Sequence, residues 1–358
     1  MQTIEEKISI IEFLPPDVAI YIFEYLDFYS LSKLYLYEPD KHIIYYLSLP
    51  NNSFVKKYHI NTRLFEGVLA ANKDIVNMLV KVDHINMNQA DRFGITPLFR
   101  AVQQSNLDIV NLLLENKNID VNKATCRLES PLYIAASKGN KEITLRLLKV
   151  PEIKLTTWST QMVCIGNTPL YIAVLNNHKD IVQILLDKDK DKGNKCINMC
   201  NRINFETGGT PLWLAANEGQ LDIVNLLLNN DNIDVNIKNL ENQRTPLIQA
   251  GYKDRQKVFQ ILLKKTDINE NELKDLLYKL ALKGYKKICN IILDTNKISP
   301  NDLHEVMNWL GNEYISEHVY FSARVDTHKE IIKSMITKRG QLKSKEKNIK
   351  ETFSKLKI

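Results

Sequence analysis

The chain of 358 residues is poor in the residues that mark several common classes of protein. It has only 12 glycines and no glycine-rich loop that could hold a phosphate group, which argues against a nucleotide-binding enzyme. Its five cysteines are scattered and odd in number, so we expect reduced thiols rather than a disulfide framework. No apolar run reaches the roughly 18 residues of a membrane span, and the first ten residues lack the apolar segment of a secretory signal. We therefore expect an intracellular protein.

The net positive charge of the chain comes from one end. Residues 333–358 hold nine Lys or Arg and two Glu, so the net charge of +6 leaves about −1 for all the rest. Nucleic-acid binding needs a basic face on the folded part, and we do not expect a nucleic acid as partner. The basic tail, residues 338–358, leaves nuclear import open beside a cytoplasmic location.

A short motif recurs through the middle of the chain. Thr-Pro-Leu begins at Thr96, Thr168, Thr210 and Thr245, and Ser-Pro-Leu begins at Ser130. With two degenerate copies, the units start near positions 62, 96, 130, 168, 210, 245 and 275, at spacings between 30 and 42 residues. A period of this length is the signature of a repeat protein.

The units agree beyond this tripeptide. Thr or Ser followed by Pro predicts a capped helix with Pro in its first turn. An Ile or Val and a Leu-Leu pair then form the apolar stripe of a second helix. One helix pair cannot bury such a stripe alone, so the units are predicted to stack as a solenoid. The third residue after each start is large: Phe65, Phe99, Tyr133, Tyr171, Trp213, Ile248 and Tyr278.

The pattern T-P-L-(aromatic)-x-A-A-x-x-G, followed by I-V-x-L-L and I-D-V-N, resembles the ankyrin repeat over about residues 60–295. The resemblance implies an all-α repeat fold: a solenoid of about seven helix-turn-helix units with β-hairpin fingers. The family's usual His after T-P-L is replaced here by an aromatic residue or Ile. We expect apolar packing to replace the hydrogen bond that this His makes.

The two ends depart from the repeat. Residues 1–55 resemble the F-box, with a Leu-Pro entry, an amphipathic helix and a second Leu-bearing helix, but without the usual Val-Ser-Arg-x-Trp ending. The resemblance implies that Leu14, Pro15, Ile22, Leu26 and Leu31 bind a Skp-type adaptor of a cullin–RING ubiquitin ligase. A helical cap on the first repeat is the alternative. At the other end, residues 296–337 are predicted to form capping helices.

Residues that could carry chemistry are few. Cys196 and Cys200 have no second Cys or His pair at zinc-site spacing, and the seven histidines fall at unrelated repeat positions. We therefore expect no catalytic activity, no metal and no cofactor. The alternating Asp and Lys of residues 187–195 are interpreted as a solvated loop.

The class of function that remains is recognition of a partner protein. The finger after the third unit is four residues longer than the one before it and carries Trp158 and Met162. An exposed aromatic there is a typical anchor, although Trp158 packed against its neighbours is the alternative. In the ankyrin family the fingers and first helices form a concave binding face. By register this face comprises Arg92, Phe93, Gln103, Gln104, Arg127, Ser137, Lys138, Trp158, Asn176, Phe205, Asn217, Glu218, Tyr252 and Lys253.

These resemblances imply a monomeric substrate-recognition adaptor of a Skp–cullin–F-box ligase. The alternative is an ankyrin scaffold or inhibitor without a ubiquitin role. The combination of F-box and ankyrin repeats resembles proteins of large DNA viruses and intracellular bacteria, which implies a role in the host cytoplasm. The Asp-Val-Asn contexts of Asn122 and Asn236 resemble sites of asparaginyl hydroxylases, although an Asn bonded to the backbone at the finger base is the alternative.

Overall fold

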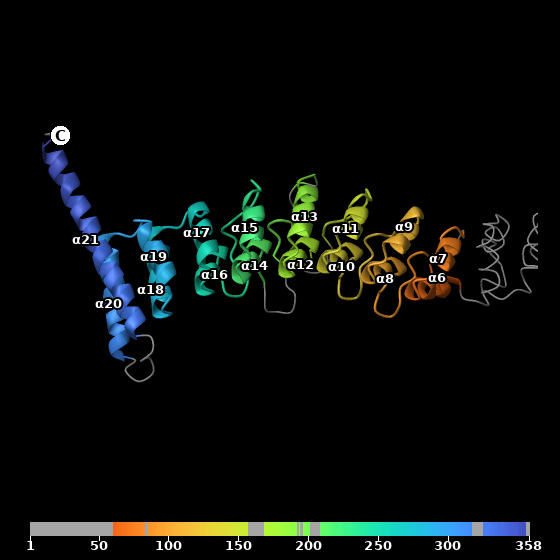
Figure 1. Ribbon diagram of the computed structural model, residues 1–358, viewed down its shortest axis with the longest axis horizontal. Helices are drawn as coiled ribbons and strands as arrows, with labels where there is room; N and C mark the ends of the chain where they lie inside the picture. Colours follow the sequence, from red (N-terminus) through yellow and green to blue (C-terminus); the bar gives the residue numbers. More distant parts are fainter. Residues whose placement is uncertain are drawn as a thin grey trace, which may run out of the picture. The chain divides into compact units, whose positions relative to one another are not determined.

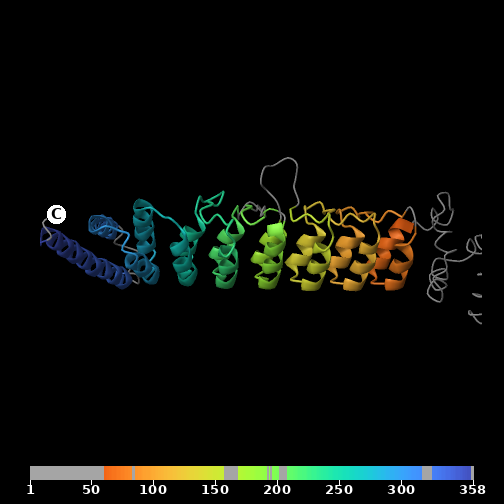
Figure 2. The ribbon, with the colours of Figure 1, turned by 90° about the horizontal axis from the view of Figure 1, so that it is seen from above.

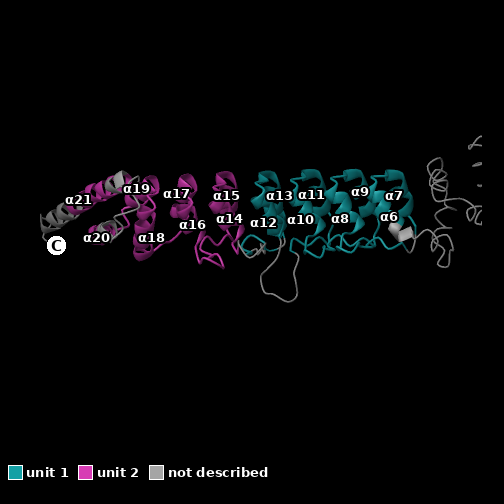
Figure 3. Cartoon of the chain, turned by 90° about the horizontal axis from the view of Figure 1, so that it is seen from below, with its two compact units in different colours: residues 1–201 teal, residues 202–358 magenta. Residues whose placement is uncertain are grey.

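The computed structural model describes residues 60–82, 85–156, 168–191, 193, 196–200, 208–316 and 325–355. These residues form helices joined by turns and irregular segments, with no strand among them. The chain divides into two compact units, Met1–Asn201 and Arg202–Ile358 (Figure 3). The F-box-like segment, Trp158 and Phe205 lie outside the described residues. None of the described helices is long and apolar enough to span a membrane.

Unit 1 consists of consecutive helix pairs, and each pair packs against the next (Figure 1). The first helices contact one another in series, and so do the second helices. This is the stacking that the apolar stripes predict. The helices are α6 (Ile60–Leu69), α7 (Lys73–Leu79), α8 (Pro97–Gln103), α9 (Leu107–Glu115), α10 (Pro131–Ser137), α11 (Lys141–Leu148), α12 (Pro169–Leu175) and α13 (Lys179–Asp191).

Unit 2 consists of three helix pairs and two further helices that pack on the last pair. Helix α20 contacts α18, and α21 contacts α18, α19 and α20. The long α21 continues well beyond position 338, into the basic tail. The helices are α14 (Pro211–Glu218), α15 (Leu221–Leu228), α16 (Pro246–Tyr252), α17 (Gln256–Lys265), α18 (Glu270–Leu282), α19 (Lys286–Asp294), α20 (Pro300–Ser316) and α21 (Val325–Lys355).

Neighbouring residues in the sequence determine where the helices begin. Thr96 caps α8: its Oγ1 accepts a hydrogen bond from the Phe99 N–H at 3.1 Å, and Pro97 occupies the first turn. The Thr or Ser that opens each Pro-Leu tripeptide makes the same bond in α10, α12, α14 and α16. The predicted caps are thus confirmed, because each oxygen satisfies an N–H group that the helix leaves free.

The large residue after four of these five caps belongs to the core, and Ile248 after the fifth is half-buried. Phe99, Tyr133, Tyr171 and Trp213 are all at least 90% buried, so apolar packing replaces the family's histidine as expected. Burial raises the pKa of Tyr133 to about 12, with a further rise from the negative charge of Glu129. The Tyr133 hydroxyl is therefore protonated at any physiological pH.

One segment differs from its interpretation as a loop. The Asp–Lys alternation continues helix α13 as far as Asp191. Asp189 within it is buried, and its carboxylate accepts hydrogen bonds from the backbone N–H groups of Cys196 and Ile197 at 3.0 and 3.2 Å. The prediction of a solvated loop was wrong here because this carboxylate organises the turn that follows the helix.

The last helix pair also begins differently. Helix α18 starts at Glu270 with Asn269 as its N-cap, five residues before the position 275 that register gives. The connection from α17 to α18 is only Thr266–Asn269, whereas residues 229–245 connect α15 to α16. The last pair therefore has no finger before it.

Candidate protein-binding surface

The two described fingers of unit 1, before α8 and α10, are short hairpin-shaped turns rather than paired strands. The Asp91 N–H donates to the Ile95 carbonyl at 3.0 Å and closes the finger before α8. The finger before α10 is closed in the same way, and its Cys126 N–H donates to the Phe93 carbonyl of the preceding finger at 3.0 Å. A single backbone hydrogen bond across each turn is fewer than a pair of β-strands requires. The turns project together from one side of the helices (Figure 2), so neighbouring tips lie at fixed positions.

Two of these tips form a surface that we call the fingertip patch: Arg92, Phe93, Arg127 and Leu128. All four side chains are exposed, Phe93 by 55% and Leu128 by 38%. The Arg92 guanidinium carbon lies 4.7 Å from the centroid of the Phe93 ring, within the range of a cation–π contact. The structure thus brings together three predicted residues and adds Leu128, which the sequence analysis did not identify.

Leu128 has an unusual backbone. Its φ is 63°, in the left-handed region, where Gly94 of the preceding finger has φ 77°. Left-handed backbone costs a residue with a side chain about 1–2 kcal/mol. The sequence carries a signal for Leu128, because a branched apolar residue stands there at the position where the preceding finger has Gly94.

Several predicted residues on the first helices connect neighbouring repeats. The Gln104 amide donates to the Leu69 carbonyl at 2.8 Å, and the Asn176 amide donates to the Ser137 carbonyl at 2.7 Å. Both carbonyls lie in the last turn of the preceding unit's first helix, where helices leave acceptors free. Lys138 is exposed.

The remaining member of this group in unit 1 is Gln103, which is half-buried. Its Oε1 accepts a hydrogen bond from Arg100 at 2.7 Å. The exposed Leu69 and Leu175, at 53% and 41%, were not predicted. Both lie at the last position of a first helix.

In unit 2, the predicted residues form two groups. Asn217 donates to the Glu218 carboxylate at 2.6 Å and accepts from the Gln249 amide at 2.6 Å. Tyr252 has two cations close to its ring centroid, Arg244 at 3.8 Å and Lys283 at 5.1 Å. Lys253 beside it is exposed.

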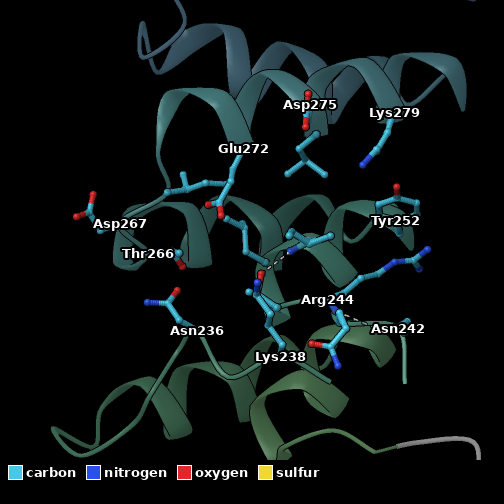
Figure 4. A pocket seen from close by; sticks show the side chains of 16 residues that line it. Asn236, Lys238, Asn242, Arg244, Tyr252, Thr266, Asp267, Glu272, Asp275 and Lys279 are labelled. Carbon is cyan, nitrogen blue, oxygen red and sulfur yellow. Dashed lines mark hydrogen bonds between the residues drawn. The ribbon is translucent and has the colours of Figure 1, made fainter. Parts of the chain in front are cut away.

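A cleft of about 390 Å³, which we call the junction cleft, opens between the last finger and helix α18. Figure 4 places Arg244, Tyr252 and Lys279 at one end and Asn236 and Thr266 at the other. Sequence reasoning identified Tyr252 and Asn236 but not the cleft. The sequence signal for the cleft was the spacing between the last two predicted starts, which at 30 residues is the shortest of the series. A unit this short lacks the residues that form a finger.

Asparagines at the finger bases connect successive repeats in unit 1. The Asn122 Nδ2 donates to the Glu152 carbonyl at 2.8 Å, and its Oδ1 accepts from the Lys154 N–H at 2.8 Å. Asn88 bonds to the equivalent carbonyl and N–H one unit earlier, at 2.7 and 2.8 Å. We call these paired bonds asparagine rungs. The side chain of Asn236 makes no such bonds with any described residue.

The described residues offer little for chemistry. They contain no group of His, Cys, Asp and Glu that could hold a metal ion. The four cysteines among them are free thiols. Burial raises the pKa of Cys289 to about 12, which makes this thiol a poor nucleophile because the thiolate is the reactive form.

Comparison with protein families gives a match to the model described as "Ankyrin repeats (3 copies)", over residues 64–157, 125–196, 153–239 and 195–272. Among solved structures, the ankyrin repeat domain of Bcl-3, described as a unique member of the IkappaB protein family, is similar with a TM-score of 0.47. It is 19% identical, and the match covers 58% of this chain and 87% of that one. No curated protein matches the chain.

Proposed function

Because the chain belongs to the ankyrin repeat proteins, we propose that it is a protein-recognition module whose fingertip patch contacts the target. The observation that carries this proposal is the exposure of Phe93, at 55%, on a tip held by backbone hydrogen bonds. An exposed aromatic on a fixed backbone loses little conformational entropy on binding, which favours affinity. Arg92 and Arg127 beside it favour a target surface that is apolar at its centre and acidic at its rim.

The test compares matched variants in quantitative capture from a eukaryotic cell extract. Phe93→Ala should lower the recovery of specific targets at least tenfold, since anchor aromatics contribute about 2 kcal/mol or more. Leu145→Ala is the control, because Leu145 is also exposed, at 41%, but lies on the second helix α11. Equal recovery with both variants would contradict the fingertip patch as the contact.

We further propose that the module selects substrates for a Skp–cullin–F-box ubiquitin ligase. The support is the F-box-like pattern of residues 11–50, outside the described part of the chain. In this role the chain performs no chemistry itself. It raises the concentration of the target near the transferring enzyme by holding both on one assembly.

A pull-down with a purified Skp-type adaptor tests the ligase role. The full chain should bind, whereas residues 55–358 and the Leu14→Ala, Pro15→Ala double variant should not, with unchanged circular dichroism of the array. A sharp fall in thermal stability without adaptor binding would instead identify the segment as a cap. The function would then be that of an ankyrin scaffold or inhibitor.

Trp158 is proposed as a second anchor for the target. It lies outside the described residues, and the support is the lengthened finger that carries it. Trp158→Ala should weaken target capture while costing less than about 1 kcal/mol of stability, as surface changes do. Unchanged capture with a large fall in melting temperature would show that Trp158 packs against the array.

A further inference from the structure

Helix α21 joins the fold through one apolar face. Ile331 and Met335, in its first half, are fully buried, and the helix packs against α18, α19 and α20. The two residues are four apart, so they lie one above the other on the same face. Among the described side chains, the last ion pair between α21 and a neighbouring helix joins Lys338 to Asp294 at 3.5 Å. Up to this point the apolar face has a partner within the chain.

The apolar face continues beyond this point. Helix α21 runs on past the helices that bury its first half (Figure 1). Leu342 is half-buried, and Lys343 beside it is exposed. The sequence then places Ile349 and Phe353 seven and eleven residues after Leu342. These spacings return to the same face of a helix as Met335, so the register of α21 carries one apolar stripe from its buried half into its second half.

The second half of α21 also carries the net charge of the chain. Residues 338–358 hold eight Lys or Arg and two Glu, a net charge of +6. The whole chain has the same net charge of +6, so residues 1–337 are neutral in sum. No excess of negative charge elsewhere in the chain offsets the positive field of this segment. The segment therefore attracts an anionic partner.

The type of cation and the apolar stripe distinguish between anionic partners. All six cations after position 339 are Lys. Lys carries a hydrated point charge on a flexible stem, whereas Arg is the residue that holds carboxylates and phosphates bidentately. Lys without Arg thus favours a diffuse negative surface over one positioned acidic group. A nucleic acid would leave the apolar stripe in water, but a lipid bilayer offers an anionic surface with an apolar layer beneath it.

We propose that the second half of α21, residues 340–355, binds the surface of an anionic membrane as an amphipathic helix. Leu342, Ile349 and Phe353 enter the boundary between headgroups and acyl chains, and the Lys side chains stay at the level of the headgroups. A helix of this composition lies in the plane of the membrane. The inference goes beyond the proposed recognition of a target, because it assigns the chain a surface on which it is concentrated.

Co-sedimentation of the full chain with two kinds of vesicle tests the proposal. Phosphatidylcholine vesicles with about 30% phosphatidylserine should bind it about tenfold or more tightly than phosphatidylcholine alone, and added salt should weaken this binding. Ile349→Asn with Phe353→Asn keeps the charge and removes most of the stripe, so the affinity for anionic vesicles should fall about tenfold or more. Ser344→Asn with Asn348→Ser is the matched control on another face of the helix and should bind like the wild type.

The proposal is overturned if the chain fails to bind the anionic vesicles, binds both kinds equally, or loses no affinity in the stripe variant. Tighter binding of duplex DNA or polyglutamate at the same salt concentration would also overturn it, since the segment would then serve another class of partner. Thermal melting of each variant separates lost binding from lost folding, because the buried Ile331 and Met335 are unchanged. Target capture by the fingertip patch is measured without vesicles, so either proposal can fail independently of the other.

Discussion

Replacing Asn122 with Ala should destabilise unit 1, whereas the same change at Asn236 should cost little. Asn122→Ala removes two hydrogen bonds of 2.8 Å, to the Glu152 carbonyl and from the Lys154 N–H. At about 1 kcal/mol for each bond, the loss is about 2 kcal/mol. Asn236 makes no equivalent bonds with the described residues, so its replacement should stay within about 0.5 kcal/mol, as surface changes do.

Two measurements check this difference. A loss of about 2 kcal/mol lowers the melting temperature by roughly 4–8 °C in a domain of 150–250 residues. Because repeat arrays can unfold in parts, hydrogen exchange gives the sharper test. The Lys154 amide, bonded to Asn122 Oδ1, should exchange faster only in Asn122→Ala. Equal destabilisation by both variants, or unchanged exchange at Lys154, would refute the account of the asparagine rungs.

Further predictions concern strain, pH and modification. Leu128→Gly relieves left-handed strain of about 1–2 kcal/mol and adds about 0.5–1 kcal/mol of backbone entropy cost; the net gain, between about 0 and 1.5 kcal/mol, should leave the melting temperature unchanged or higher while target capture falls. The hydrogen bond from Lys274 lowers the pKa of Asp302. The ionised carboxylate therefore stabilises unit 2 when the pH is above the ordinary pKa of Asp, and this contribution is lost as the pH falls through the lowered pKa. Acid unfolding followed by circular dichroism should be less steep in Lys274→Met. In animal cells, peptide mass spectrometry should find added oxygen on Asn236 before Asn122, since only Asn122 is held by both amide atoms; no added oxygen on either peptide contradicts the hydroxylation hypothesis.

Features that depend on neighbouring residues in the sequence were predictable. The helix starts follow from a cap and a proline in adjacent positions, as at Thr96 and Pro97. The buried row that contains Phe99 and Tyr133 follows from the period at which large residues recur. Both are decided within one repeat, so a repeated pattern identifies them without knowledge of the neighbours.

Features that depend on residues outside the immediate sequence neighbourhood were not predictable. Asp189 lies among alternating charges that favour exposure, yet the N–H groups of Cys196 and Ile197 hold its carboxylate inside the fold. Asn122 and Asn236 share the sequence Asp-Val-Asn and the same local turn but differ in their hydrogen bonds. Their states differ because the partners of Asn122, the Glu152 carbonyl and the Lys154 N–H, belong to the following repeat, and the repeat after Asn236 offers its side chain no such bond among the described residues.

The finger-less connection between α17 and α18 has a consequence for the cooperativity of folding. In a repeat protein, each unit is stabilised by its interfaces with the units beside it, so the weakest interface decides where cooperative unfolding divides. Between α16–α17 and α18–α19 the helices pack, but the four residues Thr266–Asn269 provide no finger for a backbone bond. Helices α18–α21 should therefore form a foldon of their own, which opens as a block while α14–α17 remain folded.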